Sequence, residues 1–391
     1  MYSFIRKKVI SKTTKDYDGS GDVTKDITDL PHKQIVDALN KSVGDVAYII
    51  GTDDSPTEVR EWLSTGSTVL DSIISNNPDI DGGIPVGKLV EMSGEAATGK
   101  SLISYLILKD CLDKGGLPVL IDTESACNFD FLRMLGLEPD RNLIYLQPYS
   151  IEQVFKSIEE VIRKLREENK DRLCCIVWDS VAATSTDLEL ENDFGQSQVG
   201  VHARLIGQGL RKVIRLIASE RISLVFLNQL RTKIGVMFGD PDTTPGGRSI
   251  PFMSSVRIKL YSDGKLKAGS DIIGMGIKPK IAKNRMGPPH RECHLKMYFS
   301  RGLIDEESWL DILIKSGVCE KISAQKSSYT DKSTGEVYEF QNRKFVDYVL
   351  GRPELREKLR KEVKKCLYIE PDPYKRNDEI VLEELKEDED I

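Results

Sequence analysis

Gly94-Glu-Ala-Ala-Thr-Gly99-Lys100-Ser101 is the stretch that decides the fold, because it satisfies the pattern G-x-x-x-x-G-K-[ST] at every fixed position. An apolar segment, Lys88–Ser93, precedes it, and the residues that follow, Gly99–Leu112, are typical of a helix. Glycines let such a loop wrap around phosphate groups while its backbone N–H groups point inward at the start of the helix. The sequence therefore predicts a strand, a phosphate-binding loop and a helix, the arrangement known as a P-loop.

The residues of the loop have separate expected roles. We expect Lys100 to reach the β- and γ-phosphates of a nucleoside triphosphate, and the Ser101 hydroxyl to ligate Mg²⁺. The whole loop is predicted to contact the nucleotide, through Gly94, Glu95, Ala96, Ala97, Thr98, Gly99, Lys100 and Ser101.

Acidic residues follow two other apolar segments. Asp179 ends the segment Cys175-Ile-Val-Trp-Asp179, at the strand end where ligands collect in open α/β sheets, and would hold the magnesium shell. Glu124 ends Leu120-Ile-Asp-Thr-Glu124, where a carboxylate can orient and deprotonate an attacking water. The alternative is that Asp122 or Glu124 only caps the next helix. Spacing alone leaves both interpretations open.

Apolar segments and helical segments alternate after Leu63. Near-continuous apolar strands that alternate with helices predict a parallel sheet covered on both faces, an α/β fold. The predicted strands are Lys88–Ser93, Leu117–Asp122, Leu173–Asp179, Ile222–Asn228, Val256–Leu260, Lys278–Ala282 and Cys293–Phe299. The predicted helices are Gly99–Leu112, Ile151–Arg166, Gln198–Ser219, Trp309–Ser316, Asn342–Leu350 and Pro353–Cys366.

Five parts are expected along the chain. Residues 1–30 are polar and aperiodic, which predicts a flexible segment. Residues 31–62 contain apolar residues at helical spacing, Ile35, Val36, Leu39 and Val43, which pack either on their own domain or on a neighbouring subunit. Residues 63–304 form the core and 305–370 a small C-terminal α+β domain. Residues 371–391 form an acidic tail.

Composition excludes some classes of protein. No run of about 18 apolar residues exists, so the sequence predicts no membrane span, and no apolar segment typical of a secretory signal follows the N-terminal basic residues. Seven cysteines without a C-x-x-C pair and four dispersed histidines predict reduced thiols and no Cys/His metal site. The last fourteen residues hold eight acidic residues and one lysine, a net charge of −7 against −6 for the whole chain. The rest is nearly neutral, so its surface can carry local basic patches.

Several stretches together resemble the RecA family of bacterial and phage recombinases. Besides the P-loop they include Leu63-Ser-Thr-Gly-Ser67, Gly82-Gly-Ile-Pro-Val-Gly87 and Val177-Trp-Asp-Ser-Val-Ala-Ala183. The most specific is Asn228-Gln-Leu-Arg-Thr-Lys-Ile-Gly-Val-Met-Phe-Gly-Asp-Pro-Asp-Thr-Thr-Pro-Gly-Gly247. The resemblance covers roughly residues 60–300, and the termini resemble the family only in layout.

The resemblance implies a RecA-type P-loop ATPase core, an N-terminal oligomerisation segment and a cytoplasmic protein. It implies a DNA-dependent ATPase that uses ATP and Mg²⁺, forms a helical homo-oligomeric filament on single-stranded DNA and exchanges strands with homologous double-stranded DNA. Single-strand-binding or loader proteins are expected partners. Glu124 matches the catalytic carboxylate, and Gln229 matches the glutamine that senses the γ-phosphate. Lys283 and Arg285 match cations that the neighbouring subunit supplies, which would neutralise charge on the phosphoryl oxygens.

DNA contact falls to two loops by the same resemblance. The first lies around Phe194–His202 and the second is Gly235–Gly247, whose thirteen residues include four glycines and two prolines. Exposed apolar wedges and backbone amides in such a loop suit bases and phosphates, although an ordinary surface loop has a similar composition. The expected DNA-binding residues are Val199, Arg204, Arg211, Met237, Phe238, Gly246, Gly247 and Arg248.

This sequence departs from the family pattern at three places. Asn128 and Phe131 stand where an Asp and a Tyr usually lie near adenine, Pro251 replaces a usual lysine, and the linker Ser75–Asp81 is longer. Two other functions remain open: a ring-forming helicase with the same core fold, and a regulatory relative without strand exchange. The retained Lys100, Glu124 and Gln229 favour an active ATPase.

Overall fold

The computed structural model describes residues 31–44, 46–49, 58–192, 200–218, 220–232 and 242–371. The chain divides into two compact units, Met1–Glu58 and Val59–Ile391. The first unit contains helix α2 (Pro31–Val43), as its apolar spacing predicts, and Gly44 ends that helix with a φ of 96°. The side chains of Ile35, Leu39 and Val43 on this helix are exposed.

The second unit is built around a sheet with the strand order β13-β12-β11-β10-β3-β7-β6-β4-β5. The six strands from β10 to β5 in this order are parallel, whereas β11, β12 and β13 are antiparallel to their neighbours. Their bounds are β3 (Leu89–Gly94), β4 (Leu117–Asp122), β5 (Ile144–Leu146), β6 (Cys174–Asp179), β7 (Ile222–Gln229), β10 (Val256–Ala268), β11 (Asp271–Asn284), β12 (Leu295–Tyr298) and β13 (Gly302–Leu303). The predicted α/β fold with a mostly parallel sheet is confirmed.

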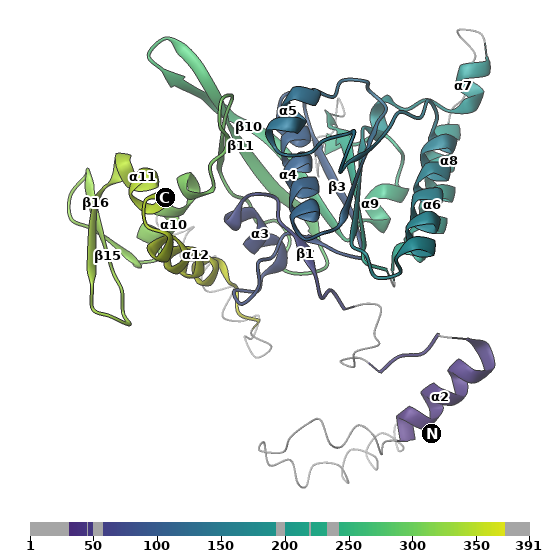
Figure 1. The fold of residues 1–391 in the computed structure, drawn as a ribbon, viewed down its shortest axis with the longest axis horizontal. Helices are drawn as coiled ribbons and strands as arrows, with labels where there is room; N and C mark the ends of the chain where they lie inside the picture. The colour runs from purple at the N-terminus through teal and green to yellow at the C-terminus, as the bar shows by residue number, and fades with distance from the viewer. Residues whose placement is uncertain are drawn as a thin grey trace, which may run out of the picture. The chain divides into compact units, whose positions relative to one another are not determined.

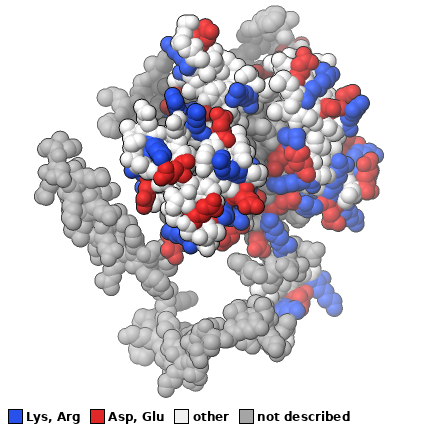
Figure 2. Space-filling view, turned by 60° about the vertical axis from the view of Figure 1, so that its left-hand side comes forward, with Lys and Arg blue, Asp and Glu red and all other residues white. Residues whose placement is uncertain are grey.

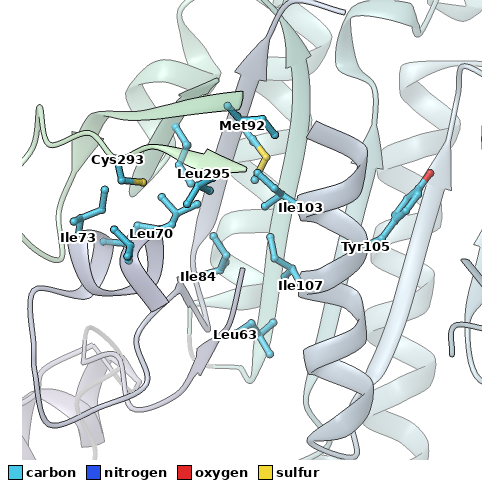
Figure 3. Close-up of a cluster of buried hydrophobic side chains, with 14 of the residues drawn as sticks. Leu63, Leu70, Ile73, Ile84, Met92, Ile103, Tyr105, Ile107, Cys293 and Leu295 are labelled. Atoms are coloured by element: carbon cyan, nitrogen blue, oxygen red, sulfur yellow. The ribbon is translucent and has the colours of Figure 1, made fainter. Parts of the chain in front are cut away.

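Helices cover both faces of this sheet, as the nearly unbroken apolar strands require. Val90 and Met92 of β3 belong to the core on the face of α3 (Thr68–Ser75) and α4 (Lys100–Asp113), which Figure 3 shows in close-up. Leu89 belongs to the core on the other face, with α6 (Ile151–Glu168), α8 (Val201–Ile217) and α9 (Ser249–Met253). Helices α6 and α8 lie side by side at the right of Figure 1.

Shorter elements complete the core. The adjacent cysteines Cys174 and Cys175 are fully buried in β6, as predicted. The remaining elements are α5 (Phe129–Met134), the 3-10 turn η2 (Val181–Ala183), α7 (Asp187–Glu191) and the small strand pairs β1–β2 (Trp62–Leu63, Ile84–Pro85) and β8–β9 (Arg231–Thr232, Asp242–Thr243). None of the helices in the described part of the chain is long and apolar enough to cross a membrane.

Strands β10 and β11 extend well beyond the predicted segments Val256–Leu260 and Lys278–Ala282 and form a long hairpin that projects from the sheet in Figure 1. Their outer halves are mostly exposed and carry little apolar alternation. Hydrophobic periodicity reports the burial of one face, so it does not detect strands that extend into solvent.

The elements after residue 304 combine helices with a three-stranded antiparallel sheet in the order β14-β15-β16. They are η3 (Asp305–Ser308), α10 (Trp309–Lys315), β14 (Cys319–Lys321), β15 (Lys326–Thr330), β16 (Val337–Gln341), η4 (Asn342–Lys344), α11 (Phe345–Leu350) and α12 (Pro353–Leu367). Helix α12 packs on α3. The linker Ser75–Asp81, which is longer than the family pattern, contacts this part of the chain. Its last residue, Asp81, is ion-paired with Arg360 and Lys364 of α12 at 2.8 and 3.2 Å.

Charges of both signs are intermixed on the face that Figure 2 presents. Ion pairs such as Lys326–Glu339 and Lys358–Asp331 also join charges of opposite sign within the C-terminal elements. On that face, the described residues therefore show no large patch of a single sign.

Candidate nucleotide-binding site and its surroundings

The predicted phosphate loop connects β3 to α4 at the carboxyl end of the parallel strands. Ala97 and Gly99 have φ values of 59° and 83°, so the loop curls through the left-handed region twice. Gly99 also has a packing reason to be glycine, because a Cβ there would lie 2.5 Å from Cδ1 of Ile277. The loop residues Glu95, Ala96 and Ala97 are exposed, which leaves their backbone open to a ligand.

Lys100 folds back over the loop. Its Nζ donates hydrogen bonds to the carbonyl oxygens of Gly94 and Glu95, at 3.0 and 2.6 Å. Burial lowers the pKa of Lys100, whereas the nearby carboxylates of Asp179 and Glu124 act in the opposite direction. The ammonium group is therefore held over the concave side of the loop, where a phosphate anion would meet it.

Ser101 and Asp179 are in direct contact, with the Ser101 Oγ donating to Oδ2 of Asp179 at 2.9 Å. Burial is the main reason that the pKa of Asp179 rises to about 6, and the charges of Glu124 and Asp122 add to it. A cation beside Asp179 would relieve this repulsion. Within the described ranges no three His, Cys, Asp or Glu side chains gather to hold a metal. Serine, one carboxylate, water and phosphate oxygens are a donor set that suits Mg²⁺.

The structure separates the roles of Asp122 and Glu124, which the sequence left open. The carboxylate of Asp122 accepts hydrogen bonds from the backbone N–H groups of Glu124 and Cys127, both at 3.1 Å, and from the hydroxyl of Tyr145 at 2.9 Å. Asp122 therefore fixes the loop that carries Glu124. Neither acidic residue caps α5, since the Oδ1 of Asn128 accepts from the N–H of Phe131 there.

Glu124 lies beside Asp179 and Lys100, close enough that its charge acts on the pKa of both. Its Oε1 accepts a hydrogen bond from the Ser180 hydroxyl, and Ser180 directly follows Asp179. Sequence reasoning missed Ser180 as a partner, because a serine after an aspartate has no distinguishing pattern.

Gln229 is the last residue of β7 and pairs in register with Gly94, the first residue of the loop. The backbone N–H of Leu230 donates to the carbonyl of Gly94 at 3.3 Å. The exposed Gln229 side chain therefore begins next to the phosphate loop. Three residues separate Gln229 from the segment 233–241, which lies outside the described residues.

Two cavities adjoin the loop, and Phe131 lines both of them. One, of about 330 Å³, is bordered by Ser101, Glu124, Asn128 and Asp179. The other, of about 440 Å³, runs along Ala97–Leu102 to a mostly apolar wall formed by Met275, Met297, Tyr298 and Phe299. An apolar space beside a phosphate loop suits a flat base. Sequence reasoning missed this wall, since its residues come from strands more than 140 positions away from Phe131 in the chain.

Lys283 and Arg285 do not approach the phosphate loop of their own chain. Lys283 of β11 is in register with Arg257 of β10, which is in register with Glu91, three residues before Gly94. Its Nζ donates to the carbonyls of Pro251 and Phe252 at the end of α9, at 3.0 and 2.7 Å. Burial lowers the pKa of Lys283, and Arg285 adds to this effect.

Comparison with known proteins gives the family. Residues 32–304 match the family model described as the RecA N-terminal domain, a range that contains every predicted site residue. The chain belongs to the RecA family. It is 36% identical over 315 residues to Protein RecA of Rubrobacter xylanophilus, covering 81% of this chain and 87% of that protein. It is 32% identical over 346 residues to Protein RecA of Thermus thermophilus, covering 88% and 94%, and 34% identical over 309 residues to Protein RecA of Wolinella succinogenes, covering 79% and 83%.

Of the remaining residues singled out by resemblance to the RecA family, the structure describes Arg204 and Arg211 of α8 and Gly246, Gly247 and Arg248. Gly247 packs so closely on α8 that a Cβ on it would lie 2.7 Å from the Cβ of Ala203. Arg204, Arg248 and Gly247 are exposed, and Gly246 is buried. Arg211, about two helical turns beyond Arg204 in α8, is exposed and lies near Gly207. Val199, Met237 and Phe238 lie outside the described residues.

Proposed function

We propose that this RecA-family recombinase is a DNA-dependent ATPase that forms helical filaments on single-stranded DNA and exchanges strands with a homologous duplex. ATP and Mg²⁺ are its expected nucleotide and metal, and the cytoplasm its expected compartment. The observation that carries this proposal is that Lys100, Ser101, Asp179 and Glu124 converge at one end of the sheet, with Gln229 beside them.

In the proposed reaction, backbone amides of residues 94–101 and the ammonium of Lys100 hold the triphosphate. Mg²⁺, when bound through Ser101 and Asp179, neutralises the charge of the phosphates. Glu124 orients a water molecule in line with the γ-phosphorus and accepts its proton. Phe131 packs on the base, Asn128 borders the same cavity, and the apolar wall excludes water from the other side.

The site becomes complete through a neighbouring subunit. Lys283 and Arg285 are too far along their own strands to serve their own loop, so we assign them to the phosphates of the next subunit. Opposite charges supplied in trans would stabilise charge that develops on the phosphoryl oxygens. The exposed apolar residues of α2 are available to support the same assembly.

DNA would lie along the start of α8 and the segment 233–241. Arg204, Arg211 and Arg248 would contact phosphates, while Gly246 and Gly247 allow the backbone to approach closely. Val199, Met237 and Phe238 would contact bases. Gln229 would link the two functions, because it lies beside the phosphate loop and only three residues before the segment 233–241.

A ring-forming helicase or a regulatory relative without strand exchange would share the core fold. The placement of Lys283 and Arg285 away from their own phosphate loop fits subunits joined head to tail, as in rings and in filaments. Convergence of the catalytic groups favours an active ATPase over a regulatory relative.

The test is ATP hydrolysis measured with and without single-stranded DNA, together with electron microscopy in the presence of a non-hydrolysable ATP analogue. We expect hydrolysis to rise with DNA and to fall again with added salt, since phosphate contacts release counterions. We expect helical filaments. Hydrolysis that ignores DNA would exclude the recombinase, and closed rings would favour the helicase.

A further inference from the structure

A row of polar side chains crosses four neighbouring strands, from the core to the partly exposed Arg257 and Lys283. The row consists of Asn228 (β7), Glu91 (β3), Arg257 (β10) and Lys283 (β11), and we call it the buried polar row. Strand register places all four on the face covered by α8 and α9. Asn228 and Glu91 are fully buried.

Glu91 joins the row at its centre. Its Oε1 accepts a hydrogen bond from Nδ2 of Asn228 at 3.1 Å, and its Oε2 accepts from Nε of Arg257 at 2.5 Å. One carboxylate therefore fixes the side chains of both neighbouring strands.

The Asn228 end of the row lies at the nucleotide and DNA sites. The Nδ2 of Asn228 also donates to the carbonyl of Pro245 at 2.9 Å, and its Oδ1 accepts from the backbone N–H of Gln229 at 3.0 Å. Asn228 thus fixes Gln229 at one end of the segment 233–241 and Pro245 beyond its other end.

The Arg257 end of the row lies at the cations assigned to the next subunit. Arg257 pairs in register with Lys283, and its charge contributes to the lowered pKa of that lysine, after burial and Arg285. Lys283 and Arg285 both donate to the carbonyl of Phe252, the latter at 3.4 Å.

Stability alone does not account for an ion pair in this position. Removing a carboxylate and a guanidinium from water costs several kcal/mol per ion, and apolar side chains of similar volume often stabilise a core equally well or better. The surrounding face is apolar, with Phe226 in register with Glu91. An apolar replacement would therefore be available to this fold.

We propose that Glu91 is a positioning residue that couples the two nucleotide sites touched by one subunit. It holds Asn228, and with it the neighbouring Gln229, in a fixed position relative to Arg257 and the cations Lys283 and Arg285. A change at the γ-phosphate of the subunit's own nucleotide then alters how its cations meet the neighbour's nucleotide. The inference rests on the proposed function and adds the path by which neighbouring sites communicate.

The test uses two variants of the full-length protein, Glu91→Gln and the double variant Glu91→Gln/Arg257→Met. Glu91→Gln leaves Arg257 without its counter-charge, so its melting temperature should fall. The double variant removes both charges, so its melting temperature should return close to that of the wild type.

The stimulation of hydrolysis by DNA should not recover in the double variant, although its melting temperature does. We expect the double variant to keep the wild-type KM for ATP and the wild-type rate without DNA, but to lose about tenfold of the DNA-stimulated kcat, within the usual range of coupling between sites. The matched control is Glu61→Gln/Arg221→Met, which removes an ion pair of 2.8 Å outside the row and should retain full stimulation.

Three results would overturn the inference. Full DNA stimulation in the double variant would show that Glu91 only fills and stabilises the core. A loss equal to that of the control pair would show that the effect is not specific to the row. Wild-type hydrolysis that ignores DNA would overturn the proposed function together with this inference, so the two failures are distinguishable.

Discussion

Two groups of carboxylates are withdrawn from water in this molecule, and they differ in what surrounds them. At the phosphate loop, burial raises the pKa of Asp179 to about 6, and Glu124 and Asp122 add repulsion. At the start of α3, burial raises the pKa of Asp71 to about 7 and that of Asp305 to about 6. A raised pKa alone would mark both places as functional sites.

Hydrogen bonding separates the two groups. Asp71 accepts from the hydroxyl of Ser64 and from both the N–H and the hydroxyl of Thr65, at 2.5 to 2.9 Å. Asp305 accepts from the N–H and hydroxyl of Thr68, which joins the C-terminal elements to α3. Neither carboxylate is among the residues that line the two cavities at the loop, whereas Asp179 lines one of them. Carboxylates with a perturbed pKa indicate a site when they face a cavity, and indicate structure when hydrogen-bond donors enclose them.

The largest expected effect is at the phosphate loop, where the carboxylates face a cavity. Lys100→Ala should abolish ATP hydrolysis while leaving the melting temperature nearly unchanged, because it removes the cation that faces the phosphates. Phosphate release and circular dichroism would be compared with those of Lys109→Ala, an exposed lysine on the same helix that is paired with Asp113. Normal turnover by Lys100→Ala would refute the assignment of the phosphate site.

Alanine substitutions in the two groups should change stability in opposite directions. Asp71→Ala leaves buried hydroxyl and N–H groups of Ser64 and Thr65 without an acceptor, and should lower the free energy of unfolding by about 3 kcal/mol. Asp179→Ala removes a repelled carboxylate, so it should leave stability unchanged or raise it while hydrolysis is lost. Urea unfolding measures both. A destabilised Asp179→Ala with an unaffected Asp71→Ala would reverse the comparison.

The smallest expected effect is a change in the pH dependence of stability. The folded chain holds the Asp71 proton more tightly than the unfolded chain does, since the pKa rises from 3.8 to about 7. Its contribution to stability is therefore fully present below about pH 3.8 and is lost as the pH rises through about 7.

Asp71→Asn cannot titrate, so the stability difference between wild type and variant should change by about 1 kcal/mol per pH unit within this window. Melting temperatures measured from pH 4 to pH 7 would show it. Some slope should remain in the variant, because Asp305 and Asp179 shift in the same direction. If the melting temperatures of wild type and Asp71→Asn changed in parallel with pH, the raised pKa of Asp71 would be contradicted.

The sequence predicts the core of this fold well because both faces of its sheet are buried. Strand β4 begins and ends where its apolar run does, β6 and β7 differ from prediction by one residue at one end, and β3 differs by one residue at each end. The strands β14, β15 and β16 were not predicted individually, since they are short, largely exposed on one side and rich in polar residues.

The candidate site was predictable to the extent that its residues adjoin one another in motifs. The P-loop, Asp179 and Glu124 each follow an apolar strand, and parallel strands bring such ends together. The apolar wall at Met275, Met297 and Tyr298 and the contact of Ser180 with Glu124 depend on strand pairing and loop geometry far apart in the chain. No local pattern of residues encodes them.

Under the proposed assignment of Lys283 and Arg285 to the neighbouring subunit, an assembly of these subunits has a direction. Lys283 lies three residues along the strands from the level of Gly94, about 10 Å, and two strands away from it. A subunit that donates from one surface and accepts at another joins its copies head to tail, which produces either a ring or an open polymer with unlike ends. In an open polymer of this kind, one terminal subunit always holds a nucleotide without a donor. Subunits would then be added and lost differently at the two ends, because the nucleotide at one end has no donor.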